Sequence, residues 1–326
     1  MDANRIERTA VIGGGLMGVG FAHILGQAGC QVRVVDVSDQ LLERSMQRVK
    51  DSLGLFARHG LLAQDQVGPI LSRITGTTSL QEATRDAQFV IEATVEELPL
   101  KQDVFEKLDR YSPPEAILAT NTSSLKVGDI AQRVGRPERV VGSHFFYPHT
   151  VVPLVEVVYG PSTSDGVVET TAAFWKRCGK APVICRKDVN GFIVNRIQAA
   201  IAREATSMVA NGVASAGDVD RAIRLGMGVR LPLVGTLEQR DWGGLDIHYA
   251  AAQSVYPTLE NATGPLPLLV EKISRGEIGA KAGKGFYDWT GKDVNALRLK
   301  KEERLLLLIK ALKEIMPEDD DLVNNQ

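Results

Sequence analysis

The sequence predicts an α/β protein in which a doubly wound, mainly parallel sheet is followed by a mainly helical second domain. Short apolar runs typical of buried strands alternate with helical repeats over residues 1–188, as a parallel sheet requires. After a charged, glycine-containing break at 187–191, apolar residues recur every three or four positions instead. The length of 326 residues also favours two domains. We therefore expect domains at 1–188 and 189–316, followed by a disordered acidic tail at 317–326.

A glycine-rich turn follows the first strand pattern. The apolar run at 10–12 stops at a G-x-G-x-x-G motif formed by Gly13, Gly15 and Gly18. Glycine is needed there for a tight turn, for close backbone approach to a pyrophosphate and for close packing of helix on strand. The next helix begins at Leu16 and Met17, and its first amides are expected to face the phosphates with the positive end of the helix dipole behind them. The motif predicts a dinucleotide-binding loop, and the alternative is a structural turn.

An acidic residue closes the second strand pattern. Asp36 follows the apolar run at 32–35 and lies eighteen residues past Gly18. A carboxylate at this point accepts hydrogen bonds from the adenosine ribose and repels a 2′-phosphate. The next residues, Val37 and Ser38, offer no arginine for such a phosphate. The sequence therefore predicts NAD rather than NADP.

The later elements continue the alternation. Residues 40–58 have helical spacing, and a second helical piece is expected after Gly60, so that the pair forms either a wall of the substrate site or simple packing. Strands are expected at 74–75, 89–93, 117–120, 139–143 and 154–158, with a helix at 101–108. A long helix with a buried apolar stripe is expected at 192–211, and a charged helix near 295–315.

Polar residues cluster where two of these strands end. Glu92 and Glu96 follow one strand, and Asn121, Ser123 and Ser124 follow the next. In open α/β sheets ligands bind outside the carboxyl ends of the strands, so we expect Asn121 and Ser123 to contact the cofactor. The serine hydroxyls are candidates to hold the substrate oxygen or the nicotinamide. Their alternative role is to cap the next helix.

Oxidation of an alcohol by NAD requires a base that takes the hydroxyl proton, and a neutral histidine suits this task. His144 closes a strand on the ligand side of the sheet, and Glu156 lies twelve residues further on in a neighbouring strand pattern. A carboxylate on the far ring nitrogen would fix the tautomer and stabilise the imidazolium. His149 is the rival base. His23 lies inside the first helix and is expected to be a packed helix residue, while His59 and His248 have no obvious partner.

Two polar residues early in the long second-domain helix, Asn195 and Arg196, are candidates to face a cleft between the domains or simply to be solvated. The net charge of −2 gives no electrostatic reason to expect nucleic acid or an anionic membrane as partner. Three cysteines without metal-ligand spacing are expected to be buried free thiols in a reducing compartment. Because neither a signal peptide nor a membrane-spanning run is visible, we expect a cytoplasmic protein whose partner is a small-molecule substrate, with no metal.

Taken together, these residues resemble the 3-hydroxyacyl-CoA dehydrogenase family. Seven blocks occur in the order of that family, namely GGGLMGVGFA, VIEATVE, ATNTSSL, GSHFFYP, LVEVV, NGFIVNR and GKGFYDW, and they cover roughly residues 9–290. The resemblance implies a Rossmann-type domain, a mainly helical domain that forms a homodimer, and NAD as hydride acceptor.

The resemblance also implies roles for single residues. It makes His144 the general base, Glu156 its partner, Ser123 the hydroxyl that contacts substrate and nicotinamide, and Asn195 a cleft residue near the reacting carbonyl. It places Glu96 and Lys101 near the nicotinamide half of the cofactor. The helical pair at 40–70 corresponds to the segment that reaches the CoA moiety in relatives, and Arg58 is a candidate phosphate contact there.

Three departures from the family pattern bear on the substrate. Most relatives carry asparagine where Tyr147 stands and proline where Asn190 stands. The segment 226–246 resembles a branch that includes enzymes for free hydroxy acids, such as gulonate, carnitine and a pyridine alcohol. Retention of the block at 121–124 favours an acyl-CoA. We therefore expect oxidation of a short-chain 3-hydroxyacyl-CoA, with a CoA-free 3-hydroxy acid as the alternative and a non-catalytic NAD-binding protein as a lesser one.

Overall fold

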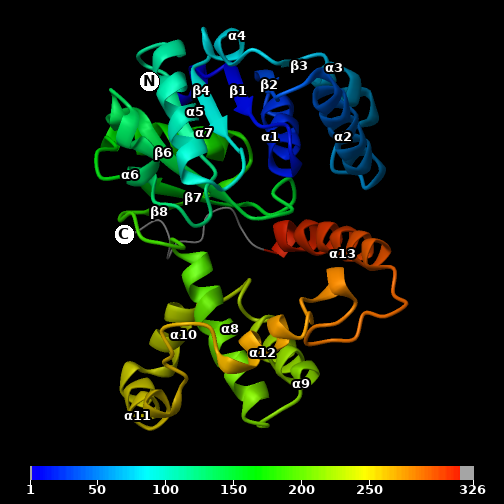
Figure 1. The fold of residues 1–326 in the computed structure, drawn as a ribbon, viewed down its shortest axis with the longest axis vertical. Coiled ribbons are helices and arrows are strands. Elements are labelled where there is room, and N and C mark those ends of the chain that lie inside the picture. Colours follow the sequence, from blue (N-terminus) through cyan, green and yellow to red (C-terminus); the bar gives the residue numbers. More distant parts are fainter. Residues whose placement is uncertain (1, 316–326) are drawn as a thin grey trace. The chain divides into compact units, whose positions relative to one another are not determined.

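A computed structural model describes residues 2–315, and the predicted tail at 317–326 lies outside this range (Figure 1). The chain packs into two compact units that divide between Arg196 and Ile197. We call them the first unit and the second unit. The division falls inside helix α8 (Val194–Ala210). The domain boundary predicted at residue 188 stays a prediction.

The first unit contains one sheet in the order β3-β2-β1-β4-β5-β6-β7-β8. Every neighbouring pair is parallel except β6 and β7, which are antiparallel. The prediction of a doubly wound, mainly parallel sheet is therefore confirmed. The strands are β1 (Arg8–Ile12), β2 (Gln31–Val35), β3 (Ile74–Thr77), β4 (Phe89–Glu92), β5 (Ile117–Thr120), β6 (Val140–Phe145), β7 (Leu154–Tyr159) and β8 (Ala181–Cys185).

Helices cover both faces of this sheet, as Figure 1 shows. One face is covered by α1 (Leu16–Gln27), α2 (Asp39–Arg58), α3 (Val67–Leu71) and α7 (Asp165–Arg177). The other is covered by α4 (Leu80–Thr84), α5 (Leu98–Tyr111) and α6 (Val127–Ile130). Successive residues of β4, such as Val90 and Ile91, enter opposite cores because side chains alternate along a strand. Short 3₁₀ turns lie at Ala3–Arg5, Gln64–Gln66, Ala131–Arg133 and Pro137–Arg139.

The helical pair after β2 packs against the core. Helix α2 begins at a serine cap, where the Ser38 hydroxyl accepts a hydrogen bond from the Leu41 amide. Its apolar face is buried at Leu42, Val49 and Leu53 within the cluster that includes α1. Burying each such side chain contributes about 1.5–3 kcal/mol, so packing accounts for this face of the helix.

The second unit is mainly helical, as predicted. Beyond α8 it contains α9 (Ala216–Ala222), a π-helical turn (Ile223–Met227), α10 (Thr236–Gly243), α11 (Leu245–Val255), α12 (Pro267–Ser274) and α13 (Val294–Ile315), with 3₁₀ turns at Tyr256–Thr258 and Ala280–Ala282. The prediction that the apolar stripe of the long helix is buried is wrong. Ile193, just before α8, is 37% exposed, and Ile197 within it is 57% exposed. The spacing of apolar residues predicts an apolar face, but it does not predict how far that face is buried.

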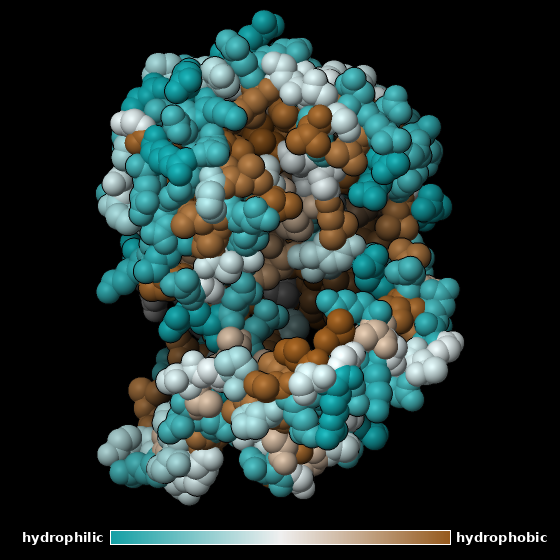
Figure 2. Space-filling view, viewed as in Figure 1, coloured by the Kyte–Doolittle hydropathy of each residue, from teal (hydrophilic) through white to brown (hydrophobic). Residues whose placement is uncertain are grey.

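Other apolar side chains of the second unit are also exposed, and Figure 2 shows apolar atoms interrupting the polar surface there. Trp242, Leu245 and Ile247 are each more than half exposed. Among residues 2–315, no helix combines the length and the apolar character needed to cross a membrane.

Candidate active site

The glycine turn after β1 has the geometry that its three glycines predict. Gly13 has a φ of +98°, and a Cβ there would lie 2.7 Å from the Ala93 carbonyl oxygen. A Cβ on Gly18 would lie 1.7 Å from the Gly13 carbonyl oxygen, so α1 packs against the turn only without a side chain. At Gly15, by contrast, nothing lies within 4 Å of an added Cβ. The turn therefore leaves open space in front of the first amides of α1, where a pyrophosphate fits.

Asp36 stands directly after β2, beside this turn. Its two carboxylate oxygens accept hydrogen bonds from the amides of Gly14 at 3.1 Å and Val37 at 2.7 Å. Each oxygen keeps acceptor capacity for the hydroxyls of a ribose. The Ser45 hydroxyl, from α2, lies 2.6 Å from the Gly14 carbonyl oxygen and holds the other side of the turn. These residues fit the adenosine half of NAD, and Ser45 escaped the sequence-based prediction because only the fold brings α2 to the loop.

His144 and Glu156 form a buried pair. They stand directly opposite each other in the antiparallel register of β6 and β7. The His144 Nδ1 lies 2.7 Å from Glu156 Oε2, and the side chains are 4% and 0% exposed. Because the carboxylate accepts the Nδ1 proton, the Nε2 atom of the neutral ring is the acceptor. The second carboxylate oxygen, Oε1, accepts the amides of Ile193 at 2.9 Å and Val194 at 2.8 Å.

Two aromatic rings pack against this pair. The Phe146 ring centroid lies 4.5 Å from that of His144, and the buried Phe192 ring centroid lies 5.5 Å from it. Both contacts are between tilted or edge-on rings, the arrangement that aromatic pairs prefer. The rings limit the access of water to the imidazole. Phe192 was not singled out from the sequence, where it is one apolar residue in the NGFIVNR block.

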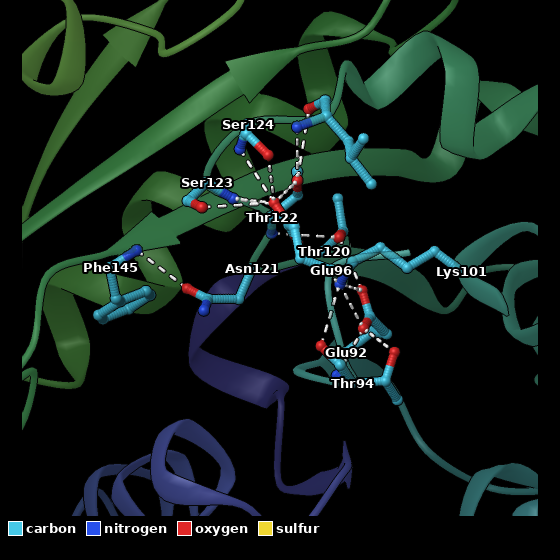
Figure 3. A network of polar contacts seen from close by, with 11 residues as sticks. Glu92, Thr94, Glu96, Lys101, Thr120, Asn121, Thr122, Ser123, Ser124 and Phe145 are labelled. Carbon is cyan, nitrogen blue, oxygen red and sulfur yellow. Dashed lines mark hydrogen bonds and ion pairs between the residues drawn. The ribbon is translucent and has the colours of Figure 1, made fainter. Parts of the chain in front are cut away.

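A single carboxylate organises the loop after β5, as Figure 3 shows. Glu96 Oε1 accepts the Thr122 hydroxyl at 2.6 Å and the amides of Ser123 and Ser124 at 2.8 and 2.9 Å. The two serine hydroxyls lie 3.3 and 3.1 Å from the same oxygen. Burial alone would raise the pKa of Glu96, but these hydrogen bonds and the nearby Lys101 ammonium lower it to about 2. Glu96 is therefore ionised at neutral pH.

Lys101 reaches this loop from α5. Its Nζ lies 2.7 and 3.0 Å from the two oxygens of Glu92 and 3.4 Å from Glu96 Oε2. Lys101 is 1% exposed and Glu92 is fully buried, and the Glu92 carboxylate also accepts the Thr94 amide and the Thr120 hydroxyl. Because a buried charge must be paired and hydrogen-bonded, this network is satisfied. Lys101 is thus directed at two carboxylates, and it acts on the loop through Glu96.

The capping role considered for Ser123 and Ser124 is wrong. Helix α6 begins at Val127, and its N-terminal amides, those of Val127 and Gly128, donate to Asp188 at 3.0 and 2.8 Å. The two serines precede the helix and are exposed, so their hydroxyls are accessible to a ligand. Asp188 was missed because it lies sixty-one residues from Val127 and only the fold joins the two.

Side-chain amides fix the other side of the same loop. Asn195 Nδ2 donates to the Ser123 carbonyl at 3.2 Å, and Asn190 Nδ2 donates to the Ser124 carbonyl at 3.3 Å. Asn121 Oδ1 accepts the Phe145 amide at 3.0 Å, which joins the end of β5 to β6, as seen in Figure 3. These contacts bring together the loop that carries Ser123, the strand that carries His144 and the start of α8.

The remaining histidines do not join this cluster. His149 is buried, its Nε2 donates to the Met17 carbonyl at 2.7 Å, and its Nδ1 has no partner among the described residues. Burial lowers the pKa of His149 to about 4 and that of His23 to about 4. His149 is therefore a buried, neutral residue whose Nε2 is engaged by the Met17 carbonyl of α1, and it lies outside the His144–Glu156 pair. His59 ends α2, and His248 Nδ1 accepts from Arg240 at 2.7 Å.

Two other predicted residues lie outside the cluster or at its margin. Arg58 is exposed at the last position of α2 and shares no hydrogen bond or ion pair with the other predicted residues among those described. The Arg196 guanidinium lies 3.4 Å from the Asn190 carbonyl oxygen. In the described part of the chain, no group of three or more histidine, cysteine or acidic side chains is arranged to hold a metal ion.

A glycine turn of the dinucleotide-binding type and a buried histidine–carboxylate pair are the parts that an NAD-dependent oxidoreductase requires, and they point to that class. Family models narrow the class. Residues 8–189 match the NAD binding domain of 3-hydroxyacyl-CoA dehydrogenase, and residues 191–289 match its C-terminal domain. The chain belongs to the 3-hydroxyacyl-CoA dehydrogenase family, which confirms the resemblance and the NAD cofactor.

Relatives of two kinds are similar over most of the chain. A probable 3-hydroxybutyryl-CoA dehydrogenase of Bacillus subtilis is 36% identical over 88% of this chain and 99% of its own length. A 5-formyl-3-hydroxy-2-methylpyridine 4-carboxylate 5-dehydrogenase of Mesorhizobium japonicum is 30% identical over 94% of this chain and 99% of its own. A crystal structure of an enzyme with that pyridine activity, described as an NAD+ dependent dismutase, superposes with a TM-score of 0.86 at 29% identity, covering 94% of this chain and 99% of the other.

Proposed function

We propose that the protein catalyses the reversible oxidation of the 3-hydroxyl of a short-chain 3-hydroxyacyl-CoA to the 3-oxo form. The observation that carries this proposal is the buried His144–Glu156 pair, joined through Asn121 to the loop that bears Ser123. NAD, when bound, accepts the hydride that leaves the carbinol carbon. The residues of the chain then have to bind the hydroxyl and remove its proton.

His144 Nε2 takes the hydroxyl proton in this proposal. Its Nδ1 proton stays with Glu156 Oε2, so the carboxylate holds the ring in one orientation and stabilises the imidazolium that forms. Because the pair is buried, this stabilisation is screened little by water. In the reverse direction the imidazolium returns its proton to the oxygen of the 3-oxo group.

Ser123 and Asn195 position the substrate oxygens. The Ser123 hydroxyl is exposed, and its backbone is fixed on one side by Glu96 and on the other by the Asn195 amide. Preorganised donors of this kind stabilise charge that develops on an oxygen. Glu96, supported by Lys101, belongs to the nicotinamide side of the site together with Asn121, and Leu16 and Met17 present their amides to the pyrophosphate.

A CoA-free acid is the second candidate substrate, and the second unit supplies an observation for it. The segment 227–242 forms a cavity of about 520 Å³ that is mainly apolar, with Arg230 and Arg240 among its lining residues and no acidic residue in its lining. Such a lining suits a small carboxylate with an apolar body. The similarity to a pyridine carboxylate dehydrogenase points in the same direction.

A substrate comparison separates the two candidates. Turnover of 3-hydroxybutyryl-CoA, free 3-hydroxybutyrate, carnitine, gulonate and a pyridine alcohol would be followed by NADH absorbance. We expect the thioester to have the largest kcat/KM, and exchange of the exposed Arg58 for Ala to raise its KM, because Arg58 is our proposed contact to the CoA phosphates. Preference for a free acid would replace the acyl-CoA proposal. NADH binding without turnover of any of these compounds would favour the non-catalytic alternative.

We also propose that the protein acts as a homodimer. Its cytoplasmic location stays a prediction. The exposed apolar side chains of the second unit, among them Ile197, Trp242 and Leu245, support this assembly, because large apolar patches commonly mark interfaces. Light scattering would give the mass of the wild type and of Leu245→Glu. A wild-type mass of one chain would contradict the dimer.

A further inference from the structure

The chain makes a strained turn immediately before α8. Gly191 has a φ of +76° and Phe192 a φ of +47°, both in the left-handed region. Within residues 2–315, Phe192 is the one residue other than glycine with a positive φ. A bulky side chain there costs free energy that the surrounding structure must offset. Residues with such backbone strain cluster at functional sites, and Phe192 lies next to the His144–Glu156 pair.

The turn directs two successive amides at one carboxylate oxygen. The amides of Ile193 and Val194 donate to Glu156 Oε1 at 2.9 and 2.8 Å. Consecutive amides next to a left-handed residue form a concave site for an anion. Since α8 begins at Val194, the positive end of its dipole adds to this field. Here the anion is the side chain that also holds His144.

The same backbone conformation places the Phe192 side chain. While the following amides face Glu156, the ring lies against the His144 imidazole, with centroids 5.5 Å apart and an angle of 57° between the planes. Phe192 is 2% exposed. One short turn therefore touches both members of the pair, the carboxylate through main-chain amides and the imidazole through an aromatic ring.

We propose that the turn 190–194 is the positioning element of the His144–Glu156 pair and that Phe192 is a positioning residue within it. The inference rests on the proposed function, because a general base needs a fixed tautomer and a fixed ring direction. The two amides prevent the Glu156 carboxylate from rotating. The Phe192 ring keeps water from competing for hydrogen bonds to that carboxylate. A relaxed turn lets the carboxylate swing, so the imidazole loses its fixed hydrogen bond.

Two glycines provide a matched test of the backbone. Gly191 and Gly179 have nearly equal φ values of +76° and +75°. An added Cβ meets no atom closer than 3.5 Å at Gly191 and none within 4 Å at Gly179, so Gly191→Ala and Gly179→Ala introduce similar strain without a clash. We expect both variants to lose similar thermal stability. Only Gly191→Ala should lower kcat, by about tenfold, with KM nearly unchanged, since small displacements of a reacting group have effects of this size or larger.

A second pair tests the ring while keeping the turn. Phe192→Leu and Phe174→Leu each remove one fully buried ring, and Phe174 packs against Phe89 and Trp175 in the core instead. We expect only Phe192→Leu to lower kcat and to move the acid limb of the pH profile of kcat/KM. Equal kcat values within both matched pairs would overturn the proposal.

A readout without substrate separates this proposal from the proposed function. The Nδ1 proton of His144 should give a downfield proton resonance in the NADH-bound protein, assigned by its absence in His144→Ala. We expect the resonance to shift or broaden in Gly191→Ala and to stay in place in Gly179→Ala. An unchanged resonance in both would contradict the positioning role. Failure of the wild type to oxidise any tested substrate would contradict only the proposed function.

Discussion

The two units of the molecule differ in whether their characteristic side chains are paired or buried within the same unit. In the first unit, the candidate catalytic and cofactor residues have partners within that unit, as His144 does with Glu156 and Ser123 with Glu96. In the second unit, apolar residues such as Ile197 and Trp242 are exposed, and an apolar cavity is built from one segment of chain. The difference teaches that the His144–Glu156 pair and the glycine turn are held by contacts within the first unit, whereas the second unit leaves apolar side chains exposed.

The largest expected effect concerns His144, the proposed base. His144→Ala should lower kcat by about 10³ to 10⁴, because it removes the proton acceptor, and Glu156→Gln by about 10² to 10³, because it disturbs only the orientation and charge of the ring. NADH binding, measured by fluorescence titration, should be nearly unchanged in both. Full turnover by His144→Ala would show that His144 is not the base, and full turnover by Glu156→Gln would show that the carboxylate does not support it.

The next effect tests the cofactor end. Asp36→Ala should weaken NADH binding by about 10- to 100-fold, because one charge-assisted hydrogen bond to the ribose is worth about 1.5–3 kcal/mol. It should also reduce the preference for NADH over NADPH, since the repulsion of a 2′-phosphate is lost. Asp39→Ala, in the exposed first turn of α2, is the matched control. Equal dissociation constants for the two variants would place the ribose elsewhere.

A contrast between short-range and long-range contacts explains which features the sequence predicts. The glycine spacing, Asp36 and the strand ends at Glu92 and Asn121 could be predicted because each depends on neighbours within a few residues. The His144–Glu156 pairing was expected because Glu156 lies in the next strand pattern and because the family resemblance implies it, and the antiparallel register of β6 and β7 supplies the contact.

Other features depend on long-range packing and escaped prediction. The contact of Asp188 with the start of α6 joins residues far apart in the chain. The left-handed φ of Phe192 contradicts the preference of that residue type and is imposed by its surroundings. The apolar face of α8 was predicted from its period, but periodicity does not identify what covers the face, and the prediction of burial was wrong.

A pH effect on stability is expected from the core of the first unit. Burial lowers the pKa of His149 to about 4, below the 6.5 of an unfolded chain, so between these values the unfolded state binds the extra proton. Acid therefore destabilises the fold, and stability rises with pH across this window. The contribution of His149 to the loss of unfolding free energy between pH 7.5 and pH 5 is about 2 kcal/mol.

His149→Gln tests this contribution, because its amide is able to keep the bond to the Met17 carbonyl without titrating. Urea unfolding followed by the fluorescence of Trp175, which is buried in the first unit, should show a smaller acid-induced loss by about 2 kcal/mol. His59→Gln, at the turn after α2, is the control. The same pH dependence in His149→Gln and the wild type would mean that His149 is not neutral in the folded core.

The smallest single effect is expected at Asn190, one of two asparagines just before the point where the chain passes from the first unit to the second. Asn190 and Asn195 donate to neighbouring carbonyls of the same loop at 3.3 and 3.2 Å. If both only support this loop, their alanine variants should behave alike. We expect Asn190→Ala to lower kcat/KM about twofold, the effect of one exposed hydrogen bond, and Asn195→Ala to lower it about 10²-fold, because our proposal gives Asn195 a second contact, to the substrate oxygen. Equal losses would reduce Asn195 to a support of the loop and leave Ser123 and His144 as the substrate contacts.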